Sequence, residues 1–183
     1  DNCTIDLLNF AENNDLDMFL VAPATKVTGN FKVDLKKYFP SKVLQGKLLL
    51  EYGKVDVGAW AYLFKKSFIE SNKLQFLSGY LFEDSEFTPR ALFYATRVGV
   101  LDFSVYHYIQ HPKSIMHTFS TIRLQHYIKV AEAIETFRKE NIDDVIIQRF
   151  FSSATAGFVL AGFNAIAAHN LPPENLTDYV DEC

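Results

Sequence analysis

The run Leu16-Asp17-Met18-Phe19-Leu20-Val21-Ala22 is almost wholly apolar and has the length of a strand. Such a run is typical of a strand that is covered on both faces of its sheet. The preceding residues 4–14 carry apolar side chains at helical spacing, and Asn13-Asn14 is a stop signal for that helix. A helix that leads directly into a buried strand predicts an α/β fold. Because α/β domains usually continue in this order rather than begin in it, we expect earlier strands upstream of Asp1.

The remaining pattern alternates between strands and helices before it becomes wholly helical. Alternating or short apolar runs predict strands at residues 30–35, 57–64, 98–103 and 105–110. Helical spacing predicts helices at residues 43–52 and 66–72, and one that begins just after Glu83-Asp84 with Pro89 near its first turn. From Ser120 the pattern is helical, and a second helix starts near Asp143-Asp144. One apolar face of the first of these helices is predicted from helical spacing: Leu124, Tyr127, Ala131, Ile134 and Phe137. The fold class is therefore α/β with flanking helices, followed by a C-terminal helical segment.

Composition limits the class of protein. The chain of 183 residues is 49% hydrophobic and 22% charged, which is ordinary for a folded globular protein. A net charge of −4 and a pI near 5.7 exclude a typical nucleic-acid binder, which needs a clustered basic face. Cys3 and Cys183 have no metal-like spacing and are expected to be reduced thiols in a cytoplasmic protein.

One stretch raises the question of a membrane. Residues 150–173 contain no charged side chain, and their number would suffice to span a bilayer. They also contain several polar or small residues: Ser152, Ser153, Thr155, Gly157, Gly162, Asn164 and His169. We therefore expect a buried C-terminal helix, with peripheral contact at the inner membrane face as the alternative.

Glu83 and Asp84 form an acidic pair at an expected helix start. Free backbone N–H groups and the helix macrodipole favour the ionised form of a carboxylate there. A carboxylate fixed in this way could act as a general base. The structural alternative is that Asp84 is an N-cap and Glu83 a first-turn acid, which is the commoner use of such residues. From the residues alone, both interpretations stay open.

Three stretches resemble, in order and spacing, the acceptor-side half of a family 2 glycosyltransferase of the GT-A fold. They are Gly-Ala-Trp-Ala-Tyr-Leu-Phe-Lys-Lys-Ser-Phe-Ile (58–69), Phe-Glu-Asp-Ser-Glu-Phe (82–87) and Tyr-His-Tyr-Ile-Gln-His-Pro-Lys-Ser-Ile (106–115). The resemblance implies a Rossmann-like mixed sheet, with residues 1–118 as the acceptor-side half and residues 119–183 as a helical segment packed on it. It also implies that Asp84 is the base that deprotonates the acceptor hydroxyl. The residue before the acidic pair is often His in the family and is Phe82 here.

The resemblance implies further residues near the acceptor or donor. Trp60 is equally open to two interpretations, a core side chain or a platform beside the acceptor pocket. The third stretch is similar to the family's Tyr-x-Tyr-Arg-x-Arg-x-x-Ser-Ile segment, and matches it at Tyr106, Tyr108, Ser114 and Ile115. Its two arginine positions hold Ile109 and His111, which puts a phosphate clamp in doubt. His111 could still donate to phosphate or, as a weaker interpretation, bind a metal.

The family's donor-binding half ends in an Asp-x-Asp motif that holds Mg²⁺ or Mn²⁺ on the donor diphosphate. We expect that motif upstream of Asp1 and absent here, so no metal site is expected in this chain. The implied partners are a nucleotide-sugar donor and a glycan or lipid-linked acceptor, in the synthesis of bacterial polysaccharide. The alternative is a non-catalytic glycan-binding or assembly module without a donor-binding half. An incomplete sheet exposes an edge, so such a module should dimerise or recruit a partner, and the oligomeric state stays open between a monomer and a homodimer.

Overall fold

The computed structural model describes residues 2–21, 43–53, 55, 57–100 and 122–169. The chain divides into two compact units. The first, Asp1–Gln75 with Phe87–Ile109, contains the sheet, and the second, Phe76–Glu86 with Gln110–Cys183, contains the two long helices. The predicted boundary at residues 118/119 lies outside the described residues, so that division stays a prediction.

The described part of the first unit contains one mixed sheet in the order β2-β4-β1-β3. Its strands are β1 (Met18–Leu20), β2 (Val43–Leu44), β3 (Tyr62–Phe64) and β4 (Val98–Val100). The central strands β1 and β4 are parallel, and β2 and β3 add antiparallel edges. All three residues of β1 are buried, as its apolar sequence predicts. The α/β class and the buried strand are both confirmed.

Asp17 sets the register of the two central strands. Its Oδ2 accepts hydrogen bonds from the backbone N–H and the hydroxyl of Thr96, at 2.8 and 2.9 Å, and from the N–H of Arg97 at 3.0 Å. The Asp17 N–H in turn donates to the Arg97 carbonyl at 2.9 Å. These bonds join the residues that precede β1 and β4, so Met18 pairs with Val98.

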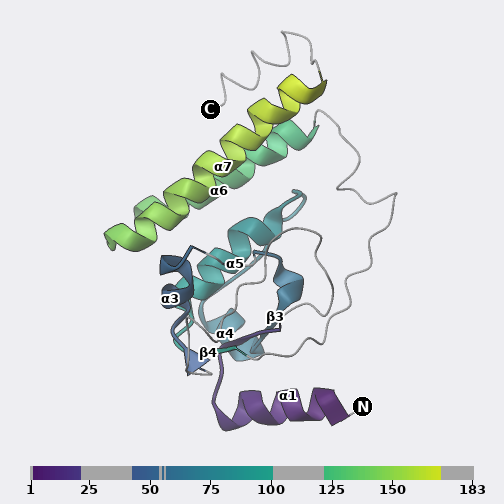
Figure 1. Cartoon of the computed structure of the whole chain (residues 1–183), viewed down its shortest axis with the longest axis vertical. Helices are drawn as coiled ribbons and strands as arrows, with labels where there is room; N and C mark the ends of the chain where they lie inside the picture. Colours follow the sequence, from purple (N-terminus) through teal and green to yellow (C-terminus); the bar gives the residue numbers. More distant parts are fainter. Residues whose placement is uncertain (1, 22–42, 54, 56, 101–121, 170–183) are drawn as a thin grey trace. The chain divides into compact units, whose positions relative to one another are not determined.

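Helices lie on both faces of this sheet (Figure 1). On one face, α1 (Asn2–Asn13) places Phe10 against Phe19 of β1, with ring centroids 5.6 Å apart. On the other, the Phe64 ring of β3 meets the edge of Phe87 in α5 (Glu83–Tyr94) at 5.5 Å. Side chains alternate along a strand, so the strands contribute to two apolar layers.

The helix predicted at residues 43–52 starts later than expected. Val43 and Leu44 form β2, and α3 covers Gly46–Glu51. Gly46 explains the start of α3, because its N–H donates to the Ala95 carbonyl at 2.9 Å and its backbone lies against α5. A Cβ on Gly46 would lie 2.1 Å from the carbonyl oxygen of Leu92. Close tertiary contact, which local spacing does not reveal, therefore decides this boundary.

Other boundaries also needed correction. The strand predicted at residues 57–64 is a 3-10 turn at Ala59–Ala61 followed by β3, whereas the short helix at 66–72 is confirmed as α4 (Lys66–Ser71). Pro89 lies in the second turn of α5 rather than its first, because α5 already begins at Glu83. The strands predicted at residues 30–35 and 105–110 lie outside the described residues.

The second unit contains α6 (Ile122–Asn141) and α7 (Val145–His169), which run antiparallel and side by side (Figure 1). The predicted apolar face of α6 is confirmed, with Leu124, Ala131, Ile134 and Phe137 buried and Tyr127 partly buried. Asp144 begins α7 as its N-cap, since its Oδ1 accepts from the N–H groups of Ile146 and Ile147 at 2.8 and 3.1 Å.

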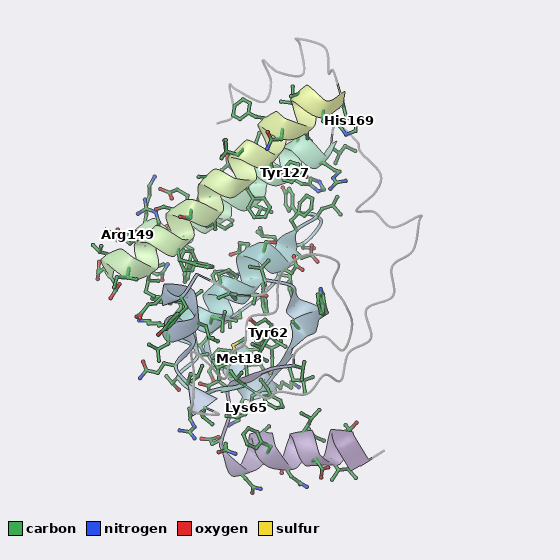
Figure 2. The ribbon with its side chains drawn as sticks, in the orientation of Figure 1. Met18, Tyr62, Lys65, Tyr127, Arg149 and His169 are labelled. Carbon is green, nitrogen blue, oxygen red and sulfur yellow. The ribbon has the colours of Figure 1, made fainter. Side chains whose placement is uncertain are left out.

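α7 is exposed over most of its length, and the prediction that it is buried was wrong. It is long and apolar enough to cross a membrane, with a mean hydropathy of 1.4 in its most apolar window, of which only 17% is buried. Leu160 is 60% exposed. Arg149 and His169 lie near the two ends of α7 (Figure 2). Within the described residues, one face of α7 packs on α6.

Candidate functional site

The acidic pair lies inside the first turn of α5, not before it. The helix begins at Glu83, so Glu83 and Asp84 are its first two residues and Glu86 completes an acidic first turn. Asp84 is partly buried, and its Oδ1 accepts from the Ser85 hydroxyl at 3.4 Å. Free N–H groups in this turn and the macrodipole favour the ionised carboxylate. The helix starts earlier than predicted, which excludes Asp84 as the N-cap.

Phe82 occupies the position before the helix. Its φ of 67° is left-handed, a region that residues with a side chain seldom adopt. Its carbonyl accepts the Ser85 N–H at 3.0 Å and so forms the first bond of the turn. A phenyl ring cannot accept hydrogen bonds from the helix N–H groups as an Asp or Ser would. Contacts of the ring must therefore hold this backbone in place.

Those contacts come from α6 and α7 within the second unit. The Phe82 ring stacks on Tyr127, with centroids 4.8 Å apart and planes 12° apart. The guanidinium carbon of buried Arg123 lies 5.3 Å from the Phe82 centroid, and Phe158 of α7 lies 6.0 Å away at a tilt of 58°. Tyr127, labelled in Figure 2, lies on α6. The ring is thus fixed by two aromatic neighbours and one cation.

The two residues before Phe82 are also held by α6. The Leu81 N–H donates to His126 Nδ1 at 2.9 Å, and the Tyr80 ring meets the His126 ring edge-on at 5.2 Å. Sequence reasoning did not identify His126 as part of this site. A usable signal existed, because Arg123, His126 and Tyr127 follow the i, i+3, i+4 spacing of one helix face.

Trp60 lies in the 3-10 turn that precedes β3 and is partly buried. Its indole folds back over Gly58, where a Cβ would lie 2.4 Å from the indole Nε1. Only glycine permits this approach. Trp60 belongs to the first unit and Asp84 to the second. The prediction that Trp60 lies beside an acceptor pocket stays a prediction.

The remaining predicted site residues, Tyr106, Tyr108, His111 and Ser114, lie outside the described residues. Their roles, including phosphate or metal binding by His111, stay predictions. Glu83 lies beside Asp84 in α5, and its role is likewise a prediction.

The described residues contain no group of three or more His, Cys, Asp or Glu side chains that could hold a metal. An Asp-x-Asp spacing does occur in the chain, at Asp15-Leu16-Asp17. That spacing precedes β1 and is used structurally. Asp17 caps the start of β4, and Asp15 pairs with Lys65 Nζ at 2.6 Å, which lowers the pKa of Asp15. These carboxylates therefore do not fit a diphosphate-bound metal.

No protein-family model matches the chain. The chain is 35% identical over 98 residues to "Putative glycosyltransferase EpsH" of Bacillus subtilis (strain 168). The match covers 52% of this chain and 28% of that protein, so the chain spans less than a third of its relative. This similarity supports a relationship to glycosyltransferases.

Proposed function

We propose that this chain is the acceptor-side portion of an inverting family 2 glycosyltransferase of the GT-A fold, with Asp84 as general base. The donor is a nucleotide-diphosphate sugar, and the acceptor is a hydroxyl on a glycan or lipid-linked glycan. The 35% identity to a glycosyltransferase carries the proposal. Because the match covers only part of that relative, the whole reaction is assigned to the complete natural polypeptide.

The position of Asp84 supports this role. A helix holds a side chain more rigidly than a loop, and the first turn of a helix keeps a carboxylate ionised. Asp84 is the second residue of α5 and is only partly buried. The helix start thus favours the charged form that a base needs, and the Asp84 side chain is not fully buried.

In the proposed reaction, Asp84 accepts the proton of the acceptor hydroxyl. The acceptor oxygen bonds to the anomeric carbon of the donor as the bond from that carbon to the diphosphate breaks. The bonding electron pair leaves with the diphosphate, and attack from the opposite face inverts the anomeric configuration. Base catalysis of this kind contributes about 10²–10⁴-fold in rate. Mg²⁺ or Mn²⁺, bound by residues outside this chain, would stabilise the leaving diphosphate.

The membrane is the proposed location of the acceptor. α7 is apolar and mostly exposed, which supports peripheral association of the protein at the cytoplasmic face of a membrane. A lipid-linked acceptor would be presented at the same surface.

The test uses the full-length natural polypeptide with a panel of UDP- and GDP-sugars and a lipid extract of the producing cells as acceptor. Release of nucleoside diphosphate is measured for the wild type and for Asp84→Asn. Turnover is expected to fall about 10²–10⁴-fold. Asp143→Asn, which neutralises an exposed acid before α7, is the matched control and should keep wild-type turnover.

Two results would contradict the proposal. Turnover by Asp84→Asn within twofold of wild type would remove Asp84 as the base. Failure of the wild type to consume any donor, together with binding of the extracted glycan, would favour the non-catalytic glycan-binding module.

A further inference from the structure

The segment Tyr80-Leu81-Phe82 is held by α6 at every residue, and it leads directly into the acidic first turn of α5. The contacts come from residues of α6 that share one face, so they act together on the segment. All of them lie within the second unit, as does Asp84. This gives a physical link between α6 and the proposed base.

We propose that His126 is a positioning residue for Asp84. In this proposal His126 holds the Leu81 backbone, and Tyr127 holds the Phe82 ring by stacking on it. The proposal rests on the proposed function, in which Asp84 takes the acceptor proton. His126 itself does not touch substrate. It fixes the backbone from which the first turn of α5 starts.

The hydrogen bond defines which ring atom of His126 is used. The Leu81 N–H donates to Nδ1 at 2.9 Å, so Nδ1 serves as the acceptor nitrogen of the ring. A second donor at this position would face the Leu81 N–H and break the contact. The bond therefore requires an acceptor atom at the place of Nδ1, which is a specific demand on residue 126.

The backbone conformation explains why such a restraint is needed. Phe82 has a left-handed φ of 67°, which is unfavourable for a residue with a Cβ. A residue in that conformation stays there only if its surroundings hold it. The His126 bond holds the residue before Phe82, and the Tyr127 stack holds its ring. Without them, relaxation of Phe82 would rotate the next peptides and displace the Asp84 carboxylate.

The central experiment compares His126→Leu with His126→Asn in the full-length natural polypeptide. Leucine removes the acceptor, whereas the asparagine Oδ1 lies close to the place of Nδ1 and can accept the Leu81 N–H. Turnover of the donor panel is measured as kcat and donor KM. His126→Leu is expected to lower kcat about 10- to 100-fold with donor KM within twofold of wild type, because small misplacement of a catalytic group acts on the chemical step. His126→Asn is expected to restore most of that loss.

Controls separate positioning from folding. Gln125→Leu adds the same side chain at the exposed neighbouring position of α6 and should leave kcat unchanged. Hydrogen exchange of the Leu81 amide should be faster in His126→Leu and near wild type in His126→Asn. If His126→Leu does not fold, Tyr127→Leu and Tyr127→Phe test the stacking part of the proposal instead, since only phenylalanine keeps a ring on Phe82. Tyr127→Leu should then lower kcat and Tyr127→Phe should not, and equal kcat values would overturn the proposal.

The outcomes distinguish the two proposals. Loss of turnover in Asp84→Asn with wild-type kcat in His126→Leu would overturn the positioning role alone. An equal loss in His126→Leu and His126→Asn would also overturn it, because the acceptor atom would then not matter. Full activity of Asp84→Asn would remove the proposed base and the positioning role with it.

Discussion

Two helices of this chain begin beside a pair of neighbouring acids, and the structure uses the two pairs differently. At α7, Asp144 precedes the helix and accepts the N–H groups of Ile146 and Ile147. At α5, Glu83 and Asp84 lie inside the first turn, and Phe82 stands in the preceding position. The same local sequence signature thus serves as a cap in one helix and not in the other.

An acidic pair in the sequence does not by itself reveal whether one of its carboxylates caps the helix. The start of α7 depends on a carboxylate, whereas the start of α5 depends on aromatic stacking and on a histidine of another helix. A structural cap therefore does not account for Asp84. Its position at an acidic helix start is consistent with chemical use.

The largest loss of folding stability is expected from Gly46→Ala, because Gly46 lies against Leu92 in the C-terminal half of α5. The new Cβ would lie 2.1 Å from the Leu92 carbonyl oxygen, so the backbone of α3 or α5 must move. Overpacking of this kind costs about 1–3 kcal/mol, and contact with a rigid backbone places this variant at the upper end. Urea unfolding followed by circular dichroism would measure the loss. Gly53→Ala, at a glycine with no atom near the added Cβ, tests strain without a clash.

A smaller effect is expected from Asp144→Ala at the start of α7. It removes an acceptor of two helix N–H groups and should lower the free energy of unfolding by about 1 kcal/mol. Asp144→Asn should be close to wild type, because asparagine is an equally good N-cap. Equal destabilisation by both variants would contradict the capping role and weaken the comparison between the two helix starts.

The smallest effect is expected from Glu135→Gln, which removes a third acid with a structural role. Its carboxylate accepts two hydrogen bonds from the Arg138 guanidinium, at 2.8 and 2.6 Å. Chiefly this bond, with help from Lys139, lowers the pKa of Glu135 from 4.5 to about 2. The stabilisation is therefore present above pH 4.5 and lost as the pH falls towards 2.

Because the pair is partly exposed to solvent, Glu135→Gln should cost at most about 1 kcal/mol at pH 7. The difference from wild type should shrink between pH 4.5 and pH 2, as thermal unfolding at a series of pH values would measure. Glu132→Gln, at an exposed pair with Lys129, is the control on the same helix. A difference that stays constant across this pH range would contradict the assigned cause.

Sequence predicted those parts of the fold that depend on local pattern. The buried run that contains Met18 and the apolar face of α6 were confirmed, because strict burial demands apolar residues at fixed spacing. The start of α3 was not predicted, because Gly46 lies against the backbone of Leu92, which is distant in the sequence. The extent of β3 was not predicted either, because the Trp60 indole folds back over Gly58 in the preceding turn. The apolar composition of α7 predicted a helix but not its exposure, which depends on what covers it.

In the candidate site, too, one part could be predicted from the sequence and another could not. The acidic pair could be found from sequence because its residue types carry the chemistry. The segment that holds it could not, because the contact between Leu81 and His126 joins residues 45 positions apart. Phe82 also could not be predicted as an anchor, because its ring contacts Tyr127 and Arg123, which are more than 40 positions away in the sequence.

The most direct test measures turnover and stability together for Asp84→Asn and Asp144→Ala in the full-length natural polypeptide. The account predicts opposite losses. Asp84→Asn should lose about 10²–10⁴-fold in turnover with little change in unfolding free energy, and Asp144→Ala should lose about 1 kcal/mol of stability with turnover intact. If Asp84→Asn instead lost unfolding free energy and kept wild-type turnover, the role of Asp84 as general base would be contradicted, because Asp84 would then be a structural acid like Asp144.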